Sequence, residues 1–215
     1  MPQDLCAAIV AACQDVRAGE LHDQFIIDTI QGGAGTSTNM NANEVICNRA
    51  LEHLGRQRGE YHYLHPNEHV NLAQSTNDVY PTAIRIATCY AIDYLLDAME
   101  VLRTAFERKA TEFSDILKLG RTQLRDAVPM TFGQEFSTYA VMIEEDMARL
   151  REAALLIREI NLGATAIGTG ITAHPAYAGK ALAALRRSPA WSGPQRRTLS
   201  KPRRIAAHSC RSRAY

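Results

Sequence analysis

The chain of 215 residues lacks the patterns that mark several common classes of protein. Its five cysteines form no Cys-x-x-Cys pair and are odd in number, which argues against a disulfide framework or a zinc ribbon and favours free thiols in a reducing compartment. No apolar run approaches the roughly 18–20 residues that cross a bilayer. The first residues carry Asp4 and no basic segment, unlike a signal peptide. We therefore expect a soluble cytoplasmic protein with no membrane partner.

Signals for β-strands are scarce as well. The sequence shows no sustained alternation of apolar and polar residues and no Asn-Gly or Asp-Gly hairpin signal. Hydrophobic residues make up 46% of the chain, enough for one real core. A net charge of +1 excludes a strongly basic nucleic-acid binder, so no nucleic-acid partner is expected.

The charge is unevenly distributed along the chain. Residues 188–215 hold seven of the 24 Lys and Arg residues and no Asp or Glu. The remaining 17 basic residues of segment 1–187 are outnumbered by its 23 acidic residues. The chain thus joins an acidic body to a basic tail.

Apolar residues recur every three or four positions through most of the body. This period predicts helices, the two longest of which far exceed the mean of about 11–12 residues. Residues 119–131, around Gly120 and Pro129, are expected to form a turn-rich link. Long helices bury their second faces against other subunits, so the expected fold is an all-α long-helix bundle in a homo-oligomer. The predicted helices span residues 2–18, 40–54, 81–112, 132–160 and 175–187.

Three polar stretches, 32–43, 65–78 and 120–126, interrupt these helices. Each is rich in hydroxyl and amide side chains, which can surround a carboxylate without adding a fixed charge, and glycines let backbone N–H groups approach an anion. The same residue types are favoured as helix N-caps, and by spacing alone capping is the stronger interpretation.

Other kinds of site are disfavoured. The glycine-rich segment 32–35 lacks the phosphate-loop pattern and follows no strand. His65 and His69 are four residues apart, but no carboxylate or cysteine completes a metal-ligand set, and Pro66 breaks the helix that this spacing needs. We expect these histidines at the surface or in a supporting role, and no metal.

Four motifs, in this order, resemble the fumarase/aspartase superfamily and within it the aspartate ammonia-lyase family. They are GGAGTSTNMNANEV (32–45), HPNEHVNLAQSTNDVYPTAIRIA (65–87), LGRTQLRDAVPMTFGQEF (119–136) and NLGATAIGTG (161–170). The resemblance runs from about residue 5 to residue 187. It implies that residues 1–64 are the remainder of an N-terminal lyase domain and that 65–187 are part of the central helical-bundle domain.

A few positions separate the ammonia-lyases from the fumarases. Fumarases typically read G-S-G-T-Q-S-N-M-N, S-S-N-D and G-R-T-H, whereas this chain has Ala34, Ser37, Thr76 and Gln123. Gln123 is the sharpest difference, because an imidazole can accept and donate a proton near neutral pH and an amide cannot.

The resemblance implies a reversible anti-elimination that converts L-aspartate to fumarate and ammonia without a cofactor. By the same resemblance, Thr36, Ser75 and Thr76 contact the β-carboxylate, and Thr122 touches the α-carboxylate. Asn77 and Gln123 hold the amino group. Family members are homotetramers in which three subunits build each active site.

The family's catalytic base is a serine in a G-S-S-x-M-P-x-K-x-N-P loop, which this sequence does not contain. We therefore assign no catalytic residue and expect the chain, as a segment shortened at both ends, to be weak or inactive alone. Two alternatives remain open. The chain could be a fumarate hydratase, or a non-catalytic subunit that associates with full-length aspartate ammonia-lyase.

The resemblance stops near Arg187, and the tail that follows suggests a reason. Permitted codons for residues 198–215, read one base earlier, spell N-L-I-E-A-T-Q-D-C-G-A-F-V-Q-V-S-G-V. The first thirteen of these residues are the continuation typical of the family. A native basic tail for nucleic-acid binding or nuclear targeting is the alternative, but it does not explain why the shifted reading frame matches the family. We predict that residues 188–215 are unstructured, out-of-frame translation and that resequencing the gene finds a one-base slip near codon 187. An intact frame through that region would refute the hypothesis.

Overall fold

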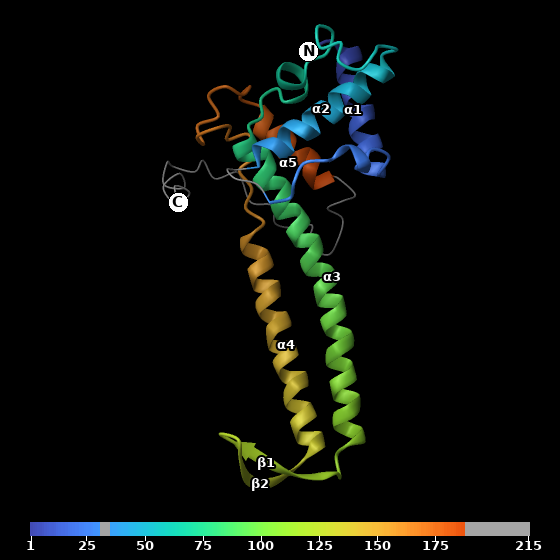
Figure 1. Ribbon diagram of the computed structural model, residues 1–215. Coiled ribbons are helices and arrows are strands. Elements are labelled where there is room, and N and C mark those ends of the chain that lie inside the picture. Colours follow the sequence, from blue (N-terminus) through green and yellow to red (C-terminus); the bar gives the residue numbers. More distant parts are fainter. Residues whose placement is uncertain (31–34, 188–215) are drawn as a thin grey trace. The chain divides into compact units, whose positions relative to one another are not determined.

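The computed structural model describes residues 1–30 and 35–187. Within them helices dominate, and the fold is all-α as expected (Figure 1). The predicted out-of-frame tail lies outside the described residues, as do residues 31–34 of the first glycine-rich motif.

Each of the five predicted helices is present. Helices α2 and α3 begin four and five residues earlier than predicted, because polar first-turn residues in both cases continue directly into the helix. Gly19, with φ 93°, ends α1 in the left-handed conformation expected of a C-cap glycine. The helices are α1 (Gln3–Ala18), α2 (Thr36–His53), α3 (Thr76–Glu112), α4 (Phe132–Leu156) and α5 (Tyr177–Arg187), with short turns of 3-10 helix at His22–Gln24 and π-helix at Pro66–Val70.

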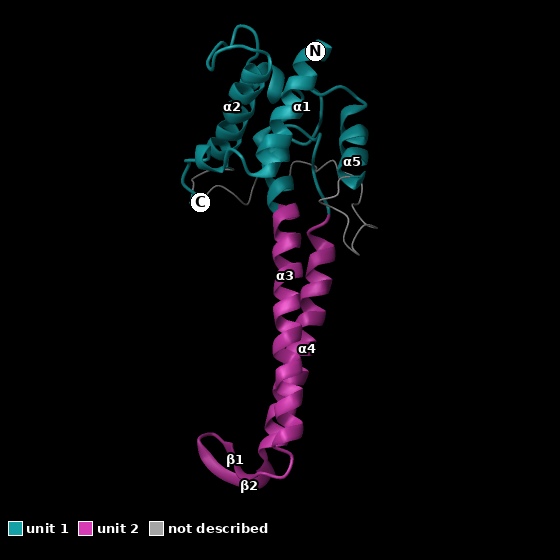
Figure 2. Ribbon diagram, turned by 90° about the vertical axis from the view of Figure 1, so that its right-hand side faces the viewer, with its two compact units in different colours: residues 1–84, 159–215 teal, residues 85–158 magenta. Residues whose placement is uncertain are grey.

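The chain divides into two compact units (Figure 2). Of the described residues, the first unit holds 1–30, 35–84 and 159–187, and the second holds 85–158. Helix α3 begins in the first unit and continues into the second. The boundary predicted between residues 64 and 65 refers to the domains of a longer subunit, so these units do not test it and it stays a prediction.

The core of the first unit lies where α1 packs on α2. Ala8 and Ala12 of α1 are buried against Cys47 and Leu51 of α2, and their small side chains let the two helices approach closely. The Cys47 thiol donates a hydrogen bond to the carbonyl oxygen of Leu64 (3.0 Å), and burial raises the Cys47 pKa to about 11. This cysteine is therefore an inert thiol of the core.

A second cluster in the same unit holds the segment after α4. Ile160 and Leu162 pack with Leu182 of α5, and Val79 of α3 lies against them. The loop that carries the fourth motif is thus anchored beside the N-terminal part of α3.

In the second unit, α3 and α4 run side by side (Figures 1 and 2). Rings of both helices meet edge to face, with Phe106 of α3 6.0 Å from Phe136 of α4 between ring centroids. The two helices leave many large apolar side chains of this unit exposed, which are Tyr94, Leu95, Val101, Leu102, Tyr139, Val141, Met142, Leu155 and Leu156.

The predicted turn-rich link over residues 119–131 is wrong, because this segment belongs to a β-hairpin. Strand β1 (Leu117–Thr122) pairs antiparallel with β2 (Arg125–Thr131), and Gln123 and Leu124 form the two-residue turn. Both turn residues have positive φ, 50° and 64°. This geometry normally selects Asn-Gly or a similar pair, so a turn without glycine gives no recognisable signal in the sequence.

Across the described ranges, we find no helix long and apolar enough to pass through a membrane.

Candidate functional site

Helix α2 follows Gly35, which lies against the Tyr80 ring of α3. A side chain on this residue would force the ring or the backbone to move. Gly35 precedes the first turn of α2 with φ 81°, and a Cβ there would lie 2.0 Å from Cε1 of Tyr80. The glycine thus permits both a left-handed backbone and direct contact with the Tyr80 ring. It places Thr36, the first residue of α2, beside the start of α3.

Ser75 begins α3 in a capping arrangement. Its Oγ accepts a hydrogen bond from the Asn77 N–H (3.2 Å), and its own N–H donates to Oδ1 of Asp78 (3.0 Å). Capping, the stronger interpretation from spacing, is therefore confirmed for Ser75. It does not hold for the first turn of α2, where Gly35 is the cap residue and no side chain caps the helix.

The carboxylate of Asp78 is fully buried and joins two motifs. Its Oδ2 accepts hydrogen bonds from the backbone N–H groups of Thr165 (2.7 Å) and Gly163 (3.2 Å), while Oδ1 accepts from Ser75. Three N–H donors compensate the desolvation of the buried charge without a basic side chain. Asp78 therefore fixes the turn at residues 75–78 to the loop at residues 161–170.

Asn77 is tied to the same loop twice. Its side-chain Nδ2 donates to the carbonyl oxygen of Ala166 (2.9 Å), and its own carbonyl oxygen accepts from Nδ2 of Asn161 (2.8 Å). The second bond follows from Pro81, which has no N–H to give to the carbonyl four residues earlier. Asn161 supplies the donor that the proline lacks.

Thr76 connects the second motif to the first. Its Oγ1 accepts a hydrogen bond from Nδ2 of the buried Asn39, in the first turn of α2, at 2.9 Å. The first unit thus brings together three of the four motifs, with Thr36, Ser75, Thr76 and Asn77 on adjoining turns. Thr36 and Asn77 are exposed, and Ser75 and Thr76 are half-buried.

Thr122 and Gln123 lie at the tip of the hairpin in the second unit, and both are exposed. Thr122 pairs with Arg125, and Gln123 occupies the first turn position with φ 50°. The hairpin therefore presents the two side chains at its end, where the strands fix the backbone that carries them.

The pKa of Tyr177, the first residue of α5, is shifted by its surroundings. Burial raises the pKa of its hydroxyl, and the negative charge of Asp78 raises it further. Tyr177 therefore remains a neutral hydroxyl at physiological pH.

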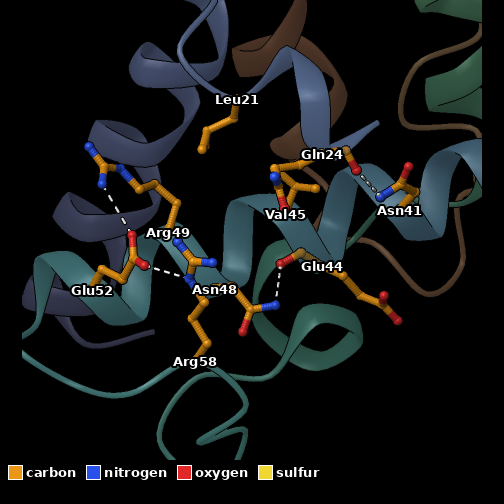
Figure 3. A pocket seen from close by; sticks show the side chains of 9 residues that line it. All are labelled: Leu21, Gln24, Asn41, Glu44, Val45, Asn48, Arg49, Glu52 and Arg58. Carbon is orange, nitrogen blue, oxygen red and sulfur yellow. Dashed lines mark hydrogen bonds and ion pairs between the residues drawn. The ribbon is translucent and has the colours of Figure 1, made fainter. Parts of the chain in front are cut away.

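A separate pocket of about 200 Å³ lies in the first unit, between α2 and the segments beside it (Figure 3). Its two guanidinium groups are paired by neighbouring carboxylates, since Arg49 lies 2.6 Å from Asp15 and 3.1 Å from Glu52, and Glu52 also pairs with Arg58. These pairs leave little unbalanced charge for a carboxylate ligand. We therefore place the candidate site at the joined motifs rather than in this pocket.

Two histidines of the second motif, His65 and His69, form hydrogen bonds with backbone N–H groups. His65 Nδ1 accepts from the N–H groups of Asn67 (3.2 Å) and Glu68 (3.3 Å), and the His65 N–H donates to Nδ1 of His69 (2.8 Å). The described part of the chain holds no cluster of side chains suited to a metal ion.

Sequence patterns do not single out the residues that support the site. Asn39, Asp78 and Asn161 touch the candidate residues but were not selected, although Ser-x-x-Asp at residues 75–78 is a capping signal. The proline four residues after Asn77 also indicated a carbonyl in need of another donor.

A family model described as a lyase matches residues 1–210. The chain belongs to this lyase family. The match confirms the expected membership of the fumarase/aspartase superfamily, and aspartate ammonia-lyases are its high-identity relatives.

The aspartate ammonia-lyase of Helicobacter pylori is 57% identical over 175 residues, which are 81% of this chain and 37% of that enzyme. The enzyme of Pseudomonas aeruginosa is 58% identical over 178 residues, 82% of this chain and 38% of its own length. The chain thus spans somewhat more than a third of the curated relatives that it matches.

Solved structures give the same picture. A cobalt-bound crystal structure of a fumarate lyase:delta crystallin from Brucella melitensis matches with a TM-score of 0.83 and 58% identity over 86% of this chain and 40% of that one. A class II fumarase from Schistosoma mansoni has a TM-score of 0.81 at 34% identity over 94% of this chain and 42% of that one. The fumarase shares the fold but is less similar in sequence than the ammonia-lyases.

We predict that Asp78→Ala lowers the free energy of unfolding by about 3 kcal/mol, because the buried N–H of Thr165 and the half-buried N–H groups of Ser75 and Gly163 lose their acceptor. Urea denaturation measures the loss, and hydrogen exchange at the amides of Gly163 and Thr165 should accelerate with it. Asp97→Ala, at an exposed position of α3, is the control and should change stability by less than about 0.5 kcal/mol. Equal unfolding midpoints for Asp78→Ala and the unsubstituted chain would contradict the role of this carboxylate.

Proposed function

We propose that the chain is the substrate-binding segment of an aspartate ammonia-lyase, which converts L-aspartate reversibly to fumarate and ammonia by anti-elimination. The observation that carries the proposal is the assembly of three motifs by the hydrogen bonds of Asn39, Asn77 and Asp78. This assembly sets hydroxyl and amide groups on adjoining turns. The chain that carries it is 57% identical to the Helicobacter pylori enzyme over 175 residues.

The proposed β-carboxylate site consists of Thr36, Ser75 and Thr76. During the reaction a base removes a proton from Cβ, and the electron pair is stabilised as charge on the β-carboxylate. Hydroxyl donors therefore bind the transition state better than the ground state, which is what acceleration requires. The N-terminus of the long helix α3 adds a favourable dipole beside Ser75 and Thr76.

The remaining candidate residues act on the α-carbon. Asn77 holds the amino group that leaves as ammonia. In the proposed tetramer, in which three subunits build each active site, Thr122 and Gln123 come from another subunit, where Thr122 donates to the α-carboxylate and Gln123 also holds the amino group. Because none of the six candidate residues is a good general base, the base is proposed to come from the serine loop of the family, outside the motifs in this sequence. The elimination needs no cofactor, since the substrate carboxylate itself accepts the electron pair.

Gln123 favours the ammonia-lyase over the fumarase as the closer functional relative. An amide can hydrogen-bond to an amino group but cannot exchange a proton at physiological pH as an imidazole can. The higher identity to aspartate ammonia-lyases supports the same choice.

The assembly that we propose is a homotetramer in the cytoplasm. Its support is the run of exposed apolar residues on α3 and α4, which a partner helix would cover. Unpaired thiols at Cys6, Cys13, Cys47 and Cys89 agree with a reducing compartment.

A chimera tests the proposed function. The matching segment of the Helicobacter pylori enzyme is replaced by the corresponding residues of this chain, so that the serine loop and the rest of the tetramer core come from the host. We expect fumarate from L-aspartate and no hydration of fumarate, whereas the purified 215-residue chain alone should give no measurable fumarate.

In that chimera, Thr76→Val should lower kcat/KM about 100-fold through the loss of one carboxylate donor. Thr111→Val removes an exposed hydroxyl on the same helix and should leave kcat/KM within about twofold. The proposal fails if a tetrameric chimera hydrates fumarate, or if it assembles without deaminating aspartate.

A further inference from the structure

Three hydrogen bonds lead from a backbone carbonyl to the hydroxyl of Thr76. The carbonyl oxygen of Gln74 accepts from Asn71 Nδ2 (3.5 Å), and Asn71 Oδ1 accepts from Asn39 Nδ2 (3.4 Å). The same Nδ2 of Asn39 donates to Thr76 Oγ1 at 2.9 Å. Asn39 is 7% exposed, so water has little access to compete for these bonds.

We call the hydrogen bonds that link Gln74, Asn71, Asn39 and Thr76 the relay. The carbonyl oxygen of Gln74 fixes the direction in which each amide of the relay donates. A carbonyl oxygen can only accept, so Asn71 must turn its NH₂ group toward Gln74 and its oxygen toward Asn39. An oxygen facing Asn39 requires the NH₂ group of Asn39 in return. The orientation of both amides therefore follows from one backbone group.

The relay determines what Thr76 can do. A threonine hydroxyl has one hydrogen and two lone pairs, and Asn39 Nδ2 occupies one of the lone pairs. The hydroxyl hydrogen must then point away from Asn39. We propose that Asn39 is a positioning residue that fixes the Thr76 hydroxyl as a donor toward the substrate carboxylate.

This inference rests on the proposed function, in which Thr76 contacts the β-carboxylate. A carboxylate accepts hydrogen bonds and cannot donate them, so a hydroxyl that turned a lone pair toward it would repel it. A hydroxyl free to rotate must also lose that freedom when the substrate binds. Asn39 removes both costs before binding, without touching the substrate itself.

A double-mutant cycle in the chimera tests this role. Asn39→Leu has nearly the same size but no donor, and we expect it to lower kcat/KM about tenfold when Thr76 is present. In the Thr76→Val background the same change should have almost no further effect, because its only route to the substrate is gone. Loss of stability alone would lower activity equally in both backgrounds.

Asn39→Asp reverses the relay. An ionised carboxylate at this position only accepts, so it would take the Thr76 hydrogen for itself and withdraw the donor from the substrate. We expect kcat/KM to fall further than in Asn39→Leu, by about 100-fold or more.

Asn43→Leu is the matched control. Asn43 is also buried, one turn further along α2, and its Nδ2 makes no hydrogen bond with the described residues. Any effect of Asn43→Leu on kcat/KM should be the same whether residue 76 is threonine or valine. An Asn39→Leu effect that is equally large in both backgrounds would overturn the proposal.

A measurement of hydrogen exchange, which needs no enzyme activity, separates this inference from the proposed function. In the 215-residue chain, the side-chain NH₂ of Asn39 should exchange with solvent slowly, and Thr76→Val should accelerate it about tenfold or more. Fast exchange in the unsubstituted chain would overturn the relay whatever the chimera does. If the chimera assembles but does not deaminate aspartate, the proposed function fails, while slow exchange that Thr76→Val accelerates still supports the relay.

Discussion

The arrangement of the candidate site depends on one buried carboxylate. Asp78 holds the N–H groups of Ser75, Gly163 and Thr165, and so joins the start of a helix to a loop more than eighty residues away in the chain. Burying a charge is costly unless several donors surround it, and the backbone supplies them here. Because the donors belong to the main chain, the carboxylate fixes the backbone of both segments without using the side chains of Ser75, Thr76 or Asn77.

The charge pattern around this point suits an anionic substrate. Asp78 is turned inward and neutralised by backbone dipoles, while hydroxyl and amide groups line the adjoining turns. The guanidinium groups of Arg49 and Arg58 are paired elsewhere, in a pocket of their own. Neutral donors bind a carboxylate less tightly than arginine does, but they can strengthen as charge develops, which is the property an elimination through a carbanion requires.

The sequence alone predicted the helices and the family. It did not predict the hairpin between α3 and α4 or the side-chain hydrogen bonds that join the motifs. Period and length predicted α3 and α4, and the motifs indicated the lyase family before any contact was known. The hairpin was missed because Gln123 and Leu124 adopt positive φ without glycine, so its backbone depends on pairing and not on local preference. Asn39 and Asn161 were missed for another reason. Their importance lies in partners 37 and 84 residues away, and no local pattern reports such a pair.

The central claim is that the joined motifs of the first unit form a binding surface for a dicarboxylate. Titrating the isotopically labelled 215-residue chain with fumarate, and following its backbone amide resonances, tests the claim most directly. The account predicts saturable changes at Thr36 and at residues 75–77 that L-aspartate competes away, with Arg49 and Arg58 unaffected. Changes centred on the arginine pocket, with none at residues 75–77, would contradict it.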